Sequence, residues 1–154
     1  MRRWTTWISV LAVLTFVATA CASGKDTGFP APSPATSSSA PANACAGVSD
    51  TATAYAGPID LAAGNCFAPK VVTVSVGEKI DWKQTDTSAP HTVTSATGGL
   101  FDSSPACPTD QTKCMAGGDT FSFKGFTKPG TYIYYCKIHG TPTGAGMAGK
   151  IIVK

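Results

Sequence analysis

The stretch YYCKIHGTPTGAGMAGKIIVK, residues 134–154, joins an aromatic run to an alternating apolar run through a segment rich in glycine. Both ends have the β-branched and aromatic composition that is typical of strands. Between them lie Cys136, His139 and Met147, whose side chains all bind soft metal ions. The stretch therefore predicts two β-strands whose connection carries candidate metal ligands.

The strand-like pattern recurs through most of the sequence after residue 44. Gly and Pro turn residues separate the candidate strands, which are 70–76, 79–84, 91–95, 119–126, 130–136 and 149–154. Only Ser49–Gly64 could hold a short helix, and its Gly57–Pro58 pair argues against a long one. We therefore predict an all-β sandwich of about seven or eight strands with one core, spanning residues 45–154.

The N-terminus has the pattern of an export signal. Arg2 and Arg3 precede an apolar run, Ile8–Val17, and then the small residues Ala18–Ala20. This apolar run is too short and too rich in threonine for a good membrane span. We therefore predict a signal peptide over residues 1–20 and an extracytoplasmic protein.

Small residues before Cys21 resemble the lipobox of bacterial lipoproteins, although Ala18 stands where that motif usually has Leu. This resemblance implies a lipid on Cys21 and attachment to the cell membrane. The Pro/Ser/Ala-rich segment that follows has almost no apolar surface, so residues 21–44 are predicted to be a tether. The alternative is a freely secreted or periplasmic protein.

Charge argues against a nucleic-acid partner. Removal of the signal would take both arginines, which leaves ten lysines against nine acidic residues. A domain so close to neutrality lacks the basic surface that phosphate backbones require.

The six cysteines do not simply predict three disulfides. If Cys21 carries lipid, Cys107 can pair with Cys114 and Cys45 with Cys66, as is common in exported proteins. Cys136 then remains as a thiol that could bind a metal. The alternatives are a buried free cysteine that only fills space, or a disulfide to one of the other cysteines.

Both histidines of the sequence fit a single metal site with Cys136. His91 follows a proline turn at the start of a candidate strand, and His139 lies three residues after the cysteine. Met147 directly precedes the last strand, whereas Met115 lies in a loop that we expect to be closed by a disulfide. Two imidazoles, a thiolate and a thioether suit both copper oxidation states, whereas a thioether is a poor zinc ligand.

Three sequence stretches resemble the signature motifs of the cupredoxins, the small blue copper proteins of the plastocyanin and amicyanin type. They are APHTVTS (89–95), YYCKIHG (134–140) and GMAGKIIV (146–153), and VVTVSVGEKIDWKQTD (71–86) resembles the strands that precede the first histidine. The resemblance implies a Greek-key sandwich that carries one electron between redox proteins as a monomer. It also implies one copper ion, with the ligands His91, Cys136, His139 and Met147.

Two positions depart from this family pattern. Gln84 stands where relatives often have Asn, so the hydrogen bond that steadies the loop before His91 is expected to differ. Seven residues separate His139 from Met147, a longer span than is typical, so a backbone carbonyl or water is an alternative axial ligand. Lys137, inside the ligand motif, is predicted to be a solvated surface charge that could steer an anionic partner.

The sequence also favours some functions over others. A copper oxidase or reductase needs a second metal centre with several more histidines, so we do not expect an enzyme. A copper-handling protein without an electron partner remains the alternative to a carrier. A structural or adhesive sandwich would leave the spacing of Cys, His and Met unexplained.

Overall fold

The computed structural model describes residues 45–154. The predicted export signal, the predicted lipidation at Cys21 and the predicted tether at residues 21–44 lie outside the described residues. Within residues 45–154, the one helix is a short 3-10 turn, and none has the length and apolarity needed to cross a bilayer.

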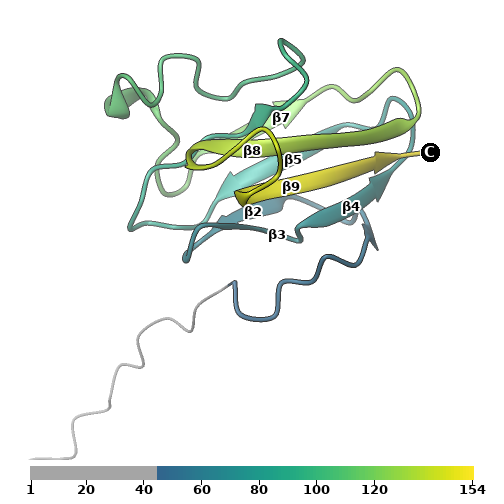
Figure 1. Cartoon of the computed structure of the whole chain (residues 1–154), viewed down its shortest axis with the longest axis horizontal. Helices are drawn as coiled ribbons and strands as arrows, with labels where there is room; N and C mark the ends of the chain where they lie inside the picture. Colours follow the sequence, from purple (N-terminus) through teal and green to yellow (C-terminus); the bar gives the residue numbers. More distant parts are fainter. Residues whose placement is uncertain (1–44) are drawn as a thin grey trace, which may run out of the picture. The chain divides into compact units, whose positions relative to one another are not determined.

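The described residues form two mixed β-sheets (Figure 1). One sheet has the order β1-β4-β9-β8-β6, with β1 Thr53–Ala54, β4 Val71–Val74, β9 Gly146–Val153, β8 Gly130–Gly140 and β6 Thr94–Ser95. The other has the order β3-β2-β5-β7, with β3 Cys66–Ala68, β2 Ile59–Ala62, β5 Ile80–Gln84 and β7 Thr120–Phe123. The 3-10 turn η1 spans Gln111–Lys113.

The prediction of an all-β sandwich is confirmed, with two corrections. Nine strands form among residues 45–154, rather than seven or eight, because the segment before residue 70 contributes three short ones. The suggested helix in Ser49–Gly64 is wrong, because that segment holds β1 and β2. Ile59 and Leu61 are fully buried with the half-buried Asp60 between them, a period of two that suits a strand.

Large side chains from both sheets fill the space between them. Trp82 of β5 and Tyr134 of β8 are fully buried, and their rings meet edge to face with centroids 5.5 Å apart. Tyr134 lies opposite Gly149 of β9, and a Cβ at Gly149 would collide with the tyrosine ring. The glycine therefore makes room for the aromatic core of the sandwich.

The long strands β8 and β9 run side by side and are joined by a narrow hairpin (Figure 1). Their pairing resumes after an irregularity, with Gly140 opposite Gly146, so β8 continues through His139. The tip closes with hydrogen bonds from Thr141 N to Ala145 O and from Gly144 N to Thr141 O, both 3.0 Å. The segment between His139 and Met147 is therefore ordered as an extension of the sheet.

Two disulfides tie loops to this framework. Cys45 bonds to Cys66 at the start of β3, and Cys107 bonds to Cys114 next to η1. These are the two pairings that the sequence analysis considered. Cys136 is the free cysteine among the described residues, and it is buried.

Candidate metal centre

Three side chains from two distant segments converge at one end of the sandwich. His91 lies in an isolated bridge that pairs it with Met115, while Cys136 and His139 lie on β8. Cys136 Sγ is 3.8 Å from His91 Nδ1 and 3.6 Å from His139 Nδ1, and the two Nδ1 atoms are 3.0 Å apart. One metal ion could reach all three atoms.

The local environment of Cys136 favours a thiolate. Burial alone would raise the pKa of this thiol, but hydrogen bonds from the His91 ring and from three backbone N–H groups lower the pKa to about 6. The three N–H groups belong to Thr92, Ile138 and His139. Because the thiolate is the form that binds metals, this cysteine is prepared as a ligand near neutral pH.

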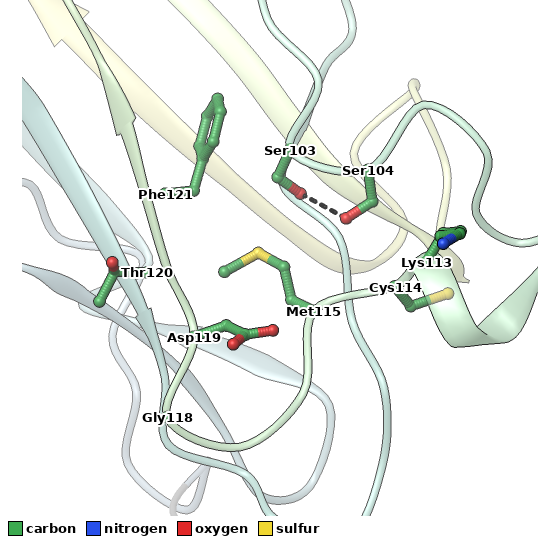
Figure 2. Close-up of a pocket in the computed structure, with 9 residues that line it drawn as sticks. All are labelled: Ser103, Ser104, Lys113, Cys114, Met115, Gly118, Asp119, Thr120 and Phe121. Atoms are coloured by element: carbon green, nitrogen blue, oxygen red, sulfur yellow. Dashed lines mark hydrogen bonds between the residues drawn. The ribbon is translucent and has the colours of Figure 1, made fainter.

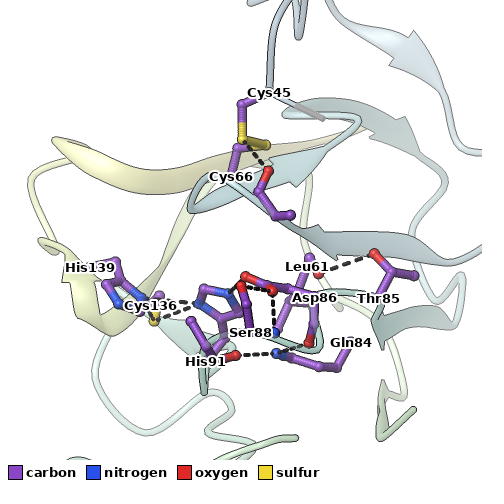
Figure 3. A network of polar contacts seen from close by, with 12 residues as sticks. Cys45, Leu61, Cys66, Gln84, Thr85, Asp86, Ser88, His91, Cys136 and His139 are labelled. Carbon is purple, nitrogen blue, oxygen red and sulfur yellow. Dashed lines mark hydrogen bonds and ion pairs between the residues drawn. A yellow bond between two sulfur atoms is a disulfide. The ribbon is translucent and has the colours of Figure 1, made fainter. Parts of the chain in front are cut away.

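His91 is fully buried and contacts a buried carboxylate on its far side (Figure 3). Its Nε2 atom lies 3.0 Å from Asp86 Oδ2, which leaves Nδ1 directed toward Cys136 and His139. Burial opposes a charge on His91, but hydrogen bonds and charge attraction from Cys136 and Asp86 outweigh it and raise the pKa of the ring. The thiolate of Cys136 and the carboxylate of Asp86 thus flank His91. The negative charges that stabilise a protonated ring would also stabilise a metal cation bound at Nδ1.

Asp86 is itself held firmly. Its Oδ1 accepts hydrogen bonds from the backbone N–H and hydroxyl of Ser88, and its own N–H donates to Leu61 O at 2.9 Å (Figure 3). Burial raises the pKa of the carboxyl, but the bonds from Ser88 and His91 outweigh this and lower the pKa to about 2. The group is therefore a carboxylate throughout the neutral range.

The loop between Gln84 and His91 is stabilised by the unusual glutamine. The buried Gln84 Nε2 donates to Asp86 O at 3.0 Å and to Ala89 O at 2.8 Å. The longer side chain therefore still braces the loop that carries the first histidine, through two backbone carbonyls.

Met147 is buried in β9, next to the residue that pairs with Gly140. A Cβ at Gly140 would collide with the Met147 backbone, so the two strands approach closely at this point. The other methionine, Met115, is buried and pairs through its backbone with His91, and it lines an open pocket that includes no residue of the Cys–His cluster (Figure 2). The lining residues are Ser103, Ser104, Lys113, Cys114, Met115, Gly118, Asp119, Thr120 and Phe121.

Lys137 is not a solvated surface charge, contrary to the prediction. Its ammonium donates to Asp102 Oδ2 and to Ser104 O at 2.8 Å each, and only 16% of the side chain is exposed. Its backbone N–H donates to Thr92 Oγ1 at 2.9 Å. Lys137 thus ties the segment between the two candidate ligands on β8 to the loop after β6.

Sequence reasoning missed both Asp86 and the Lys137–Asp102 pair. Asp86 lies in the polar run TDTSAP, which is typical of an exposed loop, and its position five residues before His91 is the one local signal. The ion pair joins residues 35 positions apart, which no local pattern reveals.

The donor set fits copper better than zinc. One thiolate and two imidazole nitrogens that lie within 4.8 Å of one another suit both Cu(I) and Cu(II). Structural zinc sites instead use four Cys or His ligands, and the whole sequence has only two histidines.

Comparisons with known proteins agree with this donor set. Residues 60–154 match the profile of the copper binding proteins, plastocyanin/azurin family. Plastocyanin from Solanum crispum is 33% identical over 93 residues, which cover 58% of this chain and 89% of that protein. The chloroplastic plastocyanin of Oryza sativa subsp. indica is 36% identical over 88 residues, covering 56% of this chain and 54% of that protein.

Solved structures with similar folds include a purple cupredoxin from Nitrosopumilus maritimus, 25% identical with a TM-score of 0.49. The alignment covers 64% of this chain and all of that one. A reduced Cu(I) form of an amicyanin variant is 26% identical with a TM-score of 0.48, covering 71% of this chain and 89% of that one. On the match over residues 60–154, the chain belongs to the plastocyanin/azurin family of copper-binding proteins, and copper is its cofactor.

Proposed function

We propose that this chain is a one-electron carrier that uses a single copper ion held by His91, Cys136, His139 and Met147. The observation that supports the proposal most directly is the convergence of one thiolate sulfur and two Nδ1 atoms within 4.8 Å of one another. Such a set favours neither oxidation state strongly, because soft sulfur suits Cu(I) and nitrogen suits Cu(II).

Fast electron exchange requires ligands that move little when the charge changes. Cys136 is fully buried on β8, and Asp86 holds the far side of the His91 ring. Copper supplies the one-electron couple when bound. The protein's contribution is to keep the ligand atoms in one arrangement for both oxidation states.

His139 is the proposed route for electrons to and from partner proteins. His91 and Cys136 are fully buried, whereas His139 is partly exposed at the end of the sandwich. A redox protein acting as donor or acceptor could therefore approach the edge of this ring. We propose that the chain acts as a monomer. We also propose that it is not an enzyme, because both histidines of the sequence would belong to this one centre and none would remain for a second one.

We further propose that the domain works outside the cytoplasmic membrane, tethered by a lipid on Cys21. The proposal rests on the sequence pattern of residues 1–44, which have a basic start, an apolar run, small residues before the cysteine and a Pro/Ser-rich segment. Mass spectrometry of the mature N-terminus tests it. A diacylated Cys21 is expected, whereas an unmodified N-terminus would favour the secreted or periplasmic alternative.

The carrier function is tested on the purified mature chain loaded with copper. We expect a strong visible thiolate-to-copper absorption and a reversible one-electron wave in voltammetry. Cys136→Ser should abolish the absorption, and a variant that kept it would contradict the ligand assignment. A copper-handling protein would instead lose its copper readily to a competing chelator, which the carrier should resist.

A further inference from the structure

We propose that Asp86 is a positioning residue for the copper ligand His91. Its carboxylate holds the Nε2–H group of the ring, directs Nδ1 to the metal and stabilises Cu(II) relative to Cu(I). The inference deepens the proposed function and rests on it, because it concerns the same copper centre.

The geometry assigns the proton on the His91 ring. Asp86 Oδ2 lies 3.0 Å from Nε2, and a carboxylate can only accept a hydrogen bond. Nε2 must therefore carry a proton, and the proton that Nδ1 donates toward Cys136 in the copper-free protein is the one that a metal ion would displace. Nδ1 faces the sulfur of Cys136 at 3.8 Å and is thus the atom available to the metal.

Hydrogen-bond donors surround both oxygens of Asp86, an arrangement that favours the charged carboxylate. Its Oδ1 atom accepts from both the N–H and the hydroxyl of Ser88. Among residues 45–154, His91 is the only titratable group that contacts this carboxylate. The side chain of Asp86 is 2% exposed, so water screens its charge only weakly.

A buried carboxylate behind a ligating histidine affects the metal in two ways. It orients the ring, and it makes the ligand nitrogen more electron-rich. A more basic nitrogen and a nearby negative charge both favour the more highly charged ion. The reduction potential of the centre should therefore be lower with Asp86 than without it.

The decisive variant is Asp86→Asn, which removes the charge but keeps an oxygen that can accept from Nε2. Mutation of a residue that holds a metal-binding histidine typically changes metal affinity about 10- to 100-fold. If this loss falls mainly on Cu(II), the potential should rise by about 59–118 mV, at about 59 mV per tenfold change. Asp60→Asn is the matched control, because Asp60 is a half-buried carboxylate on β2 that touches no ligand.

Ser88→Ala gives a second variant that keeps the charge. It removes one donor from Asp86, so the carboxylate becomes a stronger acceptor for His91 and the potential should stay constant or fall. A rise in Ser88→Ala, or equal potentials in Asp86→Asn and Asp60→Asn, would overturn the proposal.

Nitrogen NMR of the copper-free protein gives a readout that does not depend on electron transfer. The wild-type His91 ring should carry a proton on Nε2 at neutral pH, and Asp86→Ala should shift the neutral ring toward protonation on Nδ1. An unprotonated Nε2 in the wild type would refute the role of Asp86 even if copper binds normally. Conversely, a protonated Nε2 in a chain that fails to hold copper would refute the proposed function but leave the contact intact.

Discussion

Lys137 lies between two proposed copper ligands, and its charge is turned inward. Lys137→Met removes the ammonium but keeps the aliphatic length of the side chain. The variant loses the contacts to Asp102 and to the Ser104 carbonyl, and with them the side-chain link between the ligand segment of β8 and the loop after β6. We therefore expect a clear loss of stability, which a charge that only steers a partner would not produce.

The size of this loss can be bounded from burial. An exposed ion pair contributes about 0.2–1 kcal/mol, and breaking a fully buried one costs about 3–5 kcal/mol. The side chains of Lys137 and Asp102 are 16% and 30% exposed, so this pair lies between those limits. Asp102 keeps hydrogen bonds from Thr94 and Ser104, which limits the free-energy cost of leaving its carboxylate without an ammonium partner. We expect a loss of about 2 kcal/mol, or about 8 °C in Tm at about 4 °C per kcal/mol.

Denaturant unfolding of the copper-free protein measures the effect. Lys70→Met is the matched control, because Lys70 pairs with an aspartate that is largely exposed and its loss should leave stability nearly unchanged. A double-mutant cycle with Asp102→Asn should give a coupling of about 1 kcal/mol. A Lys137→Met variant as stable as wild type would show that the ammonium has no structural role. Loss of the salt dependence of electron exchange with an anionic partner in that variant would show instead that the charge steers the partner.

Three further predictions concern Cys136 and the glycines of the β8–β9 pair. The Cys136 thiolate of the copper-free protein should appear in the ultraviolet absorbance with a midpoint near its pKa of about 6, and a midpoint near 9.0 would contradict the geometry. Because this pKa is lowered from 9.0, the free energy of unfolding should rise as the pH increases between these two values. Gly140→Ala should alter the visible copper spectrum, because its Cβ would meet the backbone of Met147 on β9. Gly98→Ala, which has open space around it, should not. Gly149→Ala should cost about 1–3 kcal/mol by forcing the Tyr134 ring aside, and an unchanged unfolding midpoint would show that the ring can move freely.

The proposed ligands could be predicted from the sequence because only a few residue types bind soft metal ions. A cysteine, a histidine three residues later and a methionine before an apolar strand form a local pattern, and few other functions need it. The strands around them could be read for a similar reason, since β5, β8 and β9 each have enough residues to show apolar periodicity.

The remaining features depend on contacts between distant segments. Strands β1 and β3 have two and three residues, too few to show a period. The polar run that contains Asp86 resembles a surface loop, but the Leu61 carbonyl accepts the N–H groups of both Thr85 and Asp86 and draws the run against β2. A local sequence pattern shows neither the pairing of such short strands nor these hydrogen bonds to Leu61. The residues that hold the candidate ligands in place could therefore be identified only from the structure.

The long span between His139 and Met147 raised the question of whether a loop of this length can fix an axial ligand. Its length matters little, because Gly140 and Gly146 pair and the turn from Thr141 to Ala145 closes on itself. Met147 is therefore positioned by the register of β9 against β8, and not by the five residues at the tip. The extra length extends the hairpin after the partly exposed His139, where it adds uncharged surface next to the proposed electron route.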